Sequence, residues 1–177
     1  MANTTFSGPV RSKNGFQSIG PGAVVALTAA TNLTVADHAG RLLTMDPVGT
    51  PTAITLPTIN ATADSAVAGA SDPNNPSTIG TTFEILFIDE FTGTISTDGT
   101  DKFVGSVMVG VDDGSKKAFV PAAANDVVNL NGEAGAGNAT TGGLIGSRIK
   151  FTATADNTYM VEGLLIGDGT IVTPFGN

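Results

Sequence analysis

Short apolar runs separated by turn residues are the feature of this sequence that most restricts its fold. In residues 148–154, the apolar side chains of Ile149, Phe151 and Ala153 alternate with polar ones. This alternation predicts a strand of an antiparallel sheet with one buried face. Residues 82–88 are apolar on both faces apart from Glu84, which predicts a central strand. Similar runs recur along the chain, and about ten to twelve strands are predicted in this way.

Asp-Gly dipeptides lie between several of these runs, at Asp98-Gly99, Asp113-Gly114 and Asp168-Gly169. The tight turns of β-hairpins need positive φ angles, which Asp and Gly tolerate, so each dipeptide predicts a hairpin. No long helix is predicted. The expected fold is therefore all-β: an antiparallel β-sandwich or barrel, jelly-roll-like or β-tulip-like, with an extended N-terminal arm.

The chain divides into an arm and a body. Residues 23–177 are expected to form a single β-rich domain with long loops at 57–81 and 131–146. Residues 1–22 are interrupted by Ser-Gly-Pro and Gly-Pro-Gly, which break regular structure and predict an extended segment. Such a segment does not repay its ordering entropy alone, so we expect it to lie on a partner.

The start of the chain and the rest of it differ in net charge. Charged residues make up 14% of the chain, against about 25% in typical soluble domains. The first 36 residues contain Arg11, Lys13 and no acidic residue, while the remainder contains six basic and sixteen acidic residues, a net charge of −10. An acidic body argues against a nucleic-acid partner. A charge-poor surface favours an oligomer or a larger assembly.

Membrane and export signals are not expected. No apolar run approaches the roughly 18 residues of a membrane span, and the start of the chain does not have the order of a signal peptide. The absence of Cys fits synthesis in a reducing cytoplasm.

Motifs of catalysis are weak, and we expect no enzyme, no catalytic residue, no cofactor and no metal site. Ser147 and Lys150 have the spacing of an acylating Ser-x-x-Lys motif, but they lie on a predicted strand rather than at the start of a helix. His38 is interpreted as a turn residue. The pair Asp98 and Asp101 flanks an Asp-Gly turn, where Asp serves the turn itself. A weak calcium site among such turn carboxylates stays open.

Two segments together resemble a known class of proteins. The opening Phe6-Ser7-Gly8-Pro9-Val10-Arg11-Ser12-Lys13-Asn14-Gly15-Phe16 resembles the leader of small virion proteins of tailed bacteriophages. The C-terminal half is similar to phage head decoration (cement) proteins. The residues that carry this second likeness are 126–132, 140–143, 146–149, 160–163 and 167–175, with 38–41 and 54–57 fitting the same pattern.

The resemblance implies a β-rich module that oligomerises, usually as a trimer, on the outside of a capsid. The leading hypothesis is therefore a virion protein that is made in the host cytoplasm, decorates the outer capsid surface and binds the major capsid protein through its arm. Phe6, Val10 and Phe16 are the expected anchors, and Arg11 and Lys13 the polar contacts.

Two other hypotheses come from different classes of protein. One is a receptor- or glycan-binding head-fibre or tail-fibre adhesin that uses the loops 57–81 and 131–146. The other is a hydrolase that acts through a pair of carboxylates.

Overall fold

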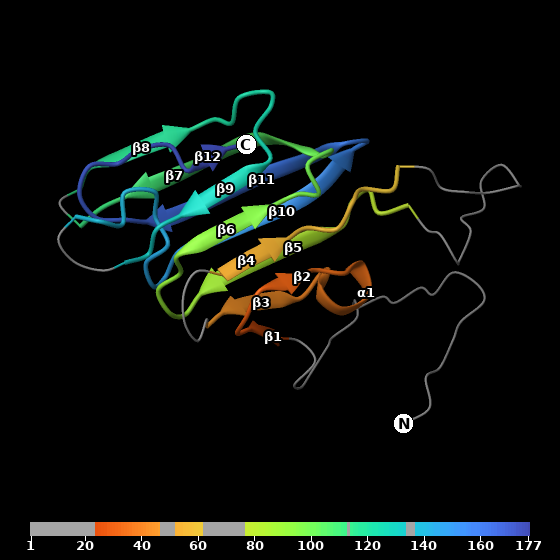
Figure 1. Ribbon diagram of the computed structural model, residues 1–177, viewed down its shortest axis with the longest axis horizontal. Helices are drawn as coiled ribbons and strands as arrows, with labels where there is room; N and C mark the ends of the chain where they lie inside the picture. The colour runs from red at the N-terminus through yellow and green to blue at the C-terminus, as the bar shows by residue number, and fades with distance from the viewer. Residues whose placement is uncertain (1–23, 47–51, 62–76, 113, 134–136) are drawn as a thin grey trace, which may run out of the picture.

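The computed structural model describes residues 24–46, 52–61, 77–112, 114–133 and 137–177 (Figure 1). The predicted arm at 1–22 lies outside the described residues. So do residues 62–76 of the first predicted long loop and residues 134–136 of the second.

Two β-sheets make up the body. The larger has seven strands in the order β1-β3-β5-β10-β11-β7-β8. Their bounds are β1 (Val24–Leu27), β3 (Leu42–Met45), β5 (Thr82–Phe87), β10 (Arg148–Ala155), β11 (Thr158–Ile166), β7 (Lys102–Gly110) and β8 (Lys116–Phe119).

The smaller sheet has five strands in the order β12-β9-β6-β4-β2. Their bounds are β12 (Phe175–Gly176), β9 (Val127–Leu130), β6 (Gly93–Ser96), β4 (Thr52–Thr55) and β2 (Thr31–Asn32). The short helix α1 (Val35–His38) links β2 to β3. The two sheets lie one behind the other in Figure 1.

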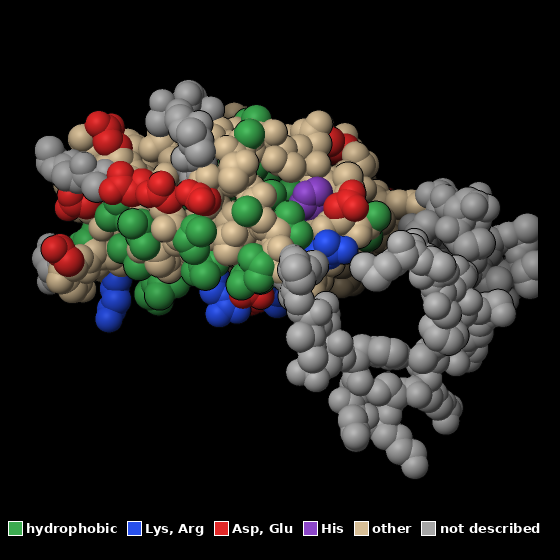
Figure 2. Space-filling view, turned by 90° about the horizontal axis from the view of Figure 1, so that it is seen from below, with side chains coloured by type: hydrophobic (Ala, Val, Ile, Leu, Met, Phe, Trp, Pro, Cys, Tyr) green, Lys and Arg blue, Asp and Glu red, His purple; other side chains and the backbone are tan. Residues whose placement is uncertain are grey.

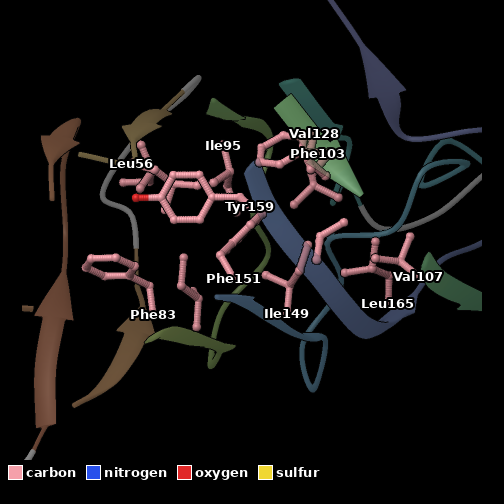
Figure 3. Close-up of a cluster of buried hydrophobic side chains, with 14 of the residues drawn as sticks. Leu56, Phe83, Ile95, Phe103, Val107, Val128, Ile149, Phe151, Tyr159 and Leu165 are labelled. Atoms are coloured by element: carbon pink, nitrogen blue, oxygen red, sulfur yellow. The ribbon is translucent and has the colours of Figure 1, made fainter. Parts of the chain in front are cut away.

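The hydrophobic core fills the space between the sheets. Phe83, Phe151 and Tyr159 from the larger sheet face Ile95 and Val128 from the smaller one, and all five side chains are fully buried (Figure 3). The fold is thus the predicted all-β sandwich. Among the described strands, both sheets are open: β1 and β8 end the larger sheet, and β12 and β2 end the smaller one.

Strand β10 shows why the alternation in the sequence was informative. Ile149, Phe151 and Ala153 point into the core with no exposed surface. The strand pairs antiparallel with β5 on one side and β11 on the other. The predicted strand, its buried face and its antiparallel pairing are all confirmed.

The sheets are mixed, whereas the sequence predicts antiparallel ones. The parallel pairs are β1 with β3, β3 with β5, β7 with β11, β2 with β4, and β4 with β6. The strands from β1 to β7 alternate between the two sheets, so in four of these five pairs the connection runs through one strand of the opposite sheet; β7 and β11 are instead connected through β8, β9 and β10. A parallel pair needs such a crossover connection. Here strands take the role that helices take in α/β proteins.

Only one of the three Asp-Gly dipeptides marks a hairpin. The dipeptide Asp113-Gly114 lies between β7 and β8, which pair antiparallel as predicted, although Asp113 itself is outside the described residues. Asp98-Gly99 instead leads from β6 in one sheet to β7 in the other, and Asp168-Gly169 leads out of β11 toward β12. These two hairpin predictions are wrong. An Asp-Gly dipeptide favours a turn, but it does not determine with which strand the following segment pairs.

The second long loop is packed against the core in its described part. The backbone N–H of Phe91 donates to the carbonyl oxygen of Gly143 at 2.8 Å. A Cβ atom built on Gly132 would lie 2.4 Å from the Gly143 oxygen and 2.6 Å from the Phe91 nitrogen. Glycine at 132 therefore allows three backbone segments to approach closely.

We expect Gly132→Ala to lower the free energy of unfolding by about 2 kcal/mol, because the atoms that the new methyl group meets are backbone atoms that cannot move aside cheaply. Urea denaturation monitored by circular dichroism measures this change. Gly110→Ala is the matched control: a Cβ at that position meets nothing within 4 Å, so its effect should stay within about 0.5 kcal/mol. Equal effects of the two substitutions would contradict the packing described here.

Candidate interaction surface

The outer sheet face, which we define as the side of the seven-stranded sheet turned away from the core, carries a row of four neighbouring side chains, of which three are apolar and one is Arg148. The register places Leu86 of β5 beside Arg148 of β10, Arg148 beside Leu164 of β11, and Leu164 beside Met108 of β7. Cross-strand neighbours on one face lie about 5 Å apart. Leu164 thus occupies the middle of this row.

Two ion pairs lie on the same face. Arg148 Nη2 is 2.5 Å from Glu84 Oε1, and Lys150 Nζ is 3.0 Å from Glu162 Oε1. Both pairs are partly exposed, and such pairs contribute little to stability because water and salt screen them. The two basic and two acidic side chains of these pairs balance in charge on this face.

The apolar side chains on this face are exposed to an unusual degree. Leu164 is 52% exposed, Val104 46% and Met108 43%. Figure 2 views the sandwich from its β1 edge, with the outer sheet face along the lower margin, where hydrophobic side chains gather beside Lys and Arg. Leu164 and Met108 are cross-strand neighbours, and adjacent exposed apolar side chains of this kind are a feature of interaction sites.

Two open grooves flank Leu164, and its side chain lines both. The acidic groove, of about 490 Å³, is lined by Asp112 and Asp168 together with apolar residues such as Leu144 and Ile166. Its lining also includes Gly110, which faces outward on β7 without a side chain and so leaves space there.

The basic groove, of about 500 Å³, lies on the other side of Leu164. Its charged lining consists of Arg148, Lys150 and Glu162, and Leu86 supplies an apolar wall. Arg148 is paired with Glu84 and Lys150 with Glu162, so the charges around this groove balance.

The structure does not test the predicted site residues. Phe6, Val10, Arg11, Lys13 and Phe16 all lie outside the described residues. Their role in binding a partner stays a prediction. The outer sheet face was not predicted from the sequence, although the apolar residues at both odd and even positions of 159–166 are a signal for it.

The residues of the Ser-x-x-Lys motif lie on opposite faces of the sheet. Ser147 is fully buried, and its Oγ accepts a hydrogen bond from the N–H of Ile166 at 2.8 Å. Lys150 points outward and pairs with Glu162. His38 lies in the single turn of α1, where its Nδ1 accepts from the N–H of Thr34 at 2.9 Å. That the chain is not an enzyme stays a prediction.

Asp98 and Asp101 form a corner between the sheets. Asp101 is fully buried, and its Oδ2 accepts from the N–H of Ile59 at 2.9 Å. Asp98 Oδ2 accepts from the Thr58 hydroxyl at 2.7 Å. Beside them, the Tyr159 hydroxyl donates to the Pro57 carbonyl at 2.6 Å. The two carboxylates therefore tie Thr58 and Ile59 to the turn that leads into β7, and Tyr159 ties Pro57 to β11.

The environment moves the pKa values of the two carboxyl groups in opposite directions. Burial raises the pKa of Asp101, and the nearby charges of Asp98 and Asp156 add to the rise. Burial alone raises the pKa of Asp98 too. Hydrogen bonds from Thr58 and from the N–H groups of Thr100 and Asp101 outweigh this, and the net pKa of Asp98 is lowered.

We expect Asp101→Ala to lower the free energy of unfolding by about 1–3 kcal/mol, because the N–H of Ile59 loses its acceptor. Asp101→Asn keeps an acceptor and removes the buried charge, so it should cost less. The raised pKa makes the folded state bind a proton more tightly than the unfolded state, so the wild type should gain stability relative to Asp101→Asn as the pH falls through the folded pKa toward about 3.9. Denaturant titrations across this pH range measure the gap, and a gap that moves the other way would contradict the assignment.

Within the residues that the structure describes, no group of three or more His, Asp or Glu side chains is placed to hold a metal ion. Among those same residues, no helix is long and apolar enough to cross a membrane. Comparison of the chain with protein-family models, with curated proteins and with solved structures found no match.

Proposed function

We propose that this chain is a structural virion protein that oligomerises, decorates and stabilises the outside of a tailed-phage capsid. The observation that carries the proposal is the outer sheet face, where Leu164, Val104 and Met108 are between 43% and 52% exposed. A chain with only 14% charged residues and an apolar sheet face open to solvent has the surface of a component of an assembly.

The arm is the proposed contact with the major capsid protein. Phe6, Val10 and Phe16 supply apolar surface to bury, and Arg11 and Lys13 supply positive charge ahead of a remainder with a net charge of −10. Extended segments of this kind bind by adding to a sheet edge or by lying over a partner. Attachment to the outer capsid surface, and the trimer typical of the resembling proteins, belong to the same proposal.

The adhesin alternative receives less support. Sugar-binding sites favour exposed aromatic rings, whereas the Phe and Tyr side chains among the described residues are buried or half-buried. The large exposed apolar side chains of that same part are aliphatic. A glycan array with the full chain separates the alternatives, because reproducible selective binding would favour the adhesin.

We expect deletion of residues 2–20 to abolish binding to heads of the encoding phage that were prepared without this chain. Co-sedimentation measures the binding, and circular dichroism checks that the truncated chain keeps its β structure. Binding at full strength after the deletion would refute the arm as the attachment.

Point variants refine this test in the full chain. Phe6→Ala combined with Phe16→Ala removes the two aromatic anchors and should weaken binding at least tenfold. Asn3→Ala combined with Thr4→Ala is the matched control in the same segment and should bind as the wild type does.

A further inference from the structure

Peptide bonds that join Asp or Asn to a following Gly occur three times among the described residues, at Asp98-Gly99, Asn131-Gly132 and Asp168-Gly169. In such a pair the backbone nitrogen of Gly can attack the side-chain carbonyl carbon of the residue before it, because Gly has no side chain to obstruct the approach. The three pairs share this reactive pattern, and the structure separates them by what each Gly nitrogen contacts.

The attack forms a bond from the Gly nitrogen to the side-chain carbon and closes a succinimide ring. The amide proton leaves with the carboxyl hydroxyl of Asp as water, or with the side-chain amino group of Asn as ammonia. A water molecule then opens the ring. Opening at the main-chain carbonyl gives isoaspartate, in which the main chain runs through the former side chain, and no oxidant, reductant or cofactor takes part.

Thr92 holds both reacting groups of the Asn131-Gly132 pair. Its Oγ1 accepts a hydrogen bond from the N–H of Gly132 at 3.2 Å and donates one to Asn131 Oδ1 at 3.4 Å. The same Asn131 oxygen accepts from the N–H of Glu133 at 3.2 Å, and Gly132 is buried. The Gly132 nitrogen therefore attacks only after this part of the loop has opened.

Asp98-Gly99 is restrained in a similar way. The N–H of Gly99 donates to Thr97 Oγ1 at 3.1 Å, and Asp98 Oδ1 accepts from the N–H groups of Thr100 and Asp101 at 2.9 and 3.2 Å. Burial raises the pKa of Asp98, but hydrogen bonds outweigh it and the net pKa is lowered. An ionised carboxylate has no hydroxyl to lose as water, so its state adds to the protection.

Asp168-Gly169 lacks these restraints. Gly169 is exposed, and among the described residues its N–H has no hydrogen-bond partner. Asp168 is half-buried, and its Oδ2 accepts a single hydrogen bond, from the N–H of Gly137 at 3.0 Å. We propose that Asp168 is a site of spontaneous isoaspartate formation in the folded protein, whereas the fold protects Asn131 and Asp98.

The modification would act on the second long loop. Asp168 joins that loop twice, since its carboxylate accepts from Gly137 and its N–H donates to the carbonyl oxygen of Ala139 at 2.9 Å. Isoaspartate moves the carboxylate to the other branch of the residue and lengthens the main chain, so it removes the acceptor from its place beside Gly137. This inference goes beyond the proposed function, because it concerns the chain whatever it binds.

The first test compares the folded full chain with the same chain unfolded in guanidinium chloride, incubated at one neutral pH. Peptide mapping by mass spectrometry follows ammonia loss at Asn131, and labelling by an isoaspartyl methyltransferase follows isoaspartate at each peptide. In the unfolded chain Asn131 should react first, because an amide loses its leaving group more readily than an ionised carboxylate. Folding should slow Asn131 by about tenfold or more and make Asp168 the first to change.

The second test removes the Thr92 hydroxyl in the folded chain. Thr92→Val keeps the shape of the side chain and should speed ammonia loss at Asn131 about fivefold, the factor that the loss of one ordinary hydrogen bond gives. Thr94→Val is the matched control, a half-buried Thr on the neighbouring β6, and should leave Asn131 unchanged. A fold that is merely less stable would speed the reaction at Asp98 as well, so an effect at Asn131 alone identifies the hydroxyl as the protecting group.

Asp168→Glu should remove the isoaspartate signal of its peptide, because Glu lacks the geometry to close a succinimide. Absence of isoaspartate at Asp168 in the folded wild type, or its earlier appearance at Asp98, would overturn the proposal. So would ammonia loss at Asn131 that is as fast in the folded chain as in the unfolded one. A folded Thr92→Val chain in which Asn131 reacts no faster would overturn the protection by Thr92.

Discussion

The alternation of strands between two sheets is the constraint on which the rest of this structure depends. Strands β1 to β7 fall in the larger and the smaller sheet by turns, so neither sheet has its parallel neighbours in place until the other is present. The hydrogen bond from Tyr159 to Pro57, and that from the Ile59 N–H to Asp101, close one corner of this arrangement. We infer that the two sheets fold as one cooperative unit.

The alternation of apolar and polar residues correctly predicted features that belong to one segment of the chain, such as a strand and its buried face. The strand at 148–155 has its buried face where the alternation of Ile149, Phe151 and Ala153 places it, because side-chain period and burial are properties of one segment. Strand pairing depends instead on distant segments. Asp98-Gly99 has the residues of a hairpin turn, yet β6 before it belongs to the smaller sheet and β7 after it to the larger one. The mixed sheets could not be predicted from turns alone.

The candidate surface could not be predicted from the sequence either, because it too depends on how distant strands pair. Its row exists only because the registers of three neighbouring strand pairs bring Leu86, Arg148, Leu164 and Met108 into line. In the sequence, Leu164 and Leu165 are adjacent apolar residues, and only the structure shows that the first faces solvent and the second the core. The arm, by contrast, was predicted from the composition of 1–22, which the described residues do not include.

The position of β1 separates two possible attachments of one chain. Val24 begins β1 at an edge of the larger sheet, and β11, which carries Leu164, is the fifth strand counted from that edge, four strand spacings or about 19 Å away. Contacts made through residues 1–22 and contacts made through Leu164 therefore start from different places. A chain that touches a shell both through residues 1–22 and at Leu164 would hold it at two places, so that when one contact is lost the other keeps the chain close enough to rebind.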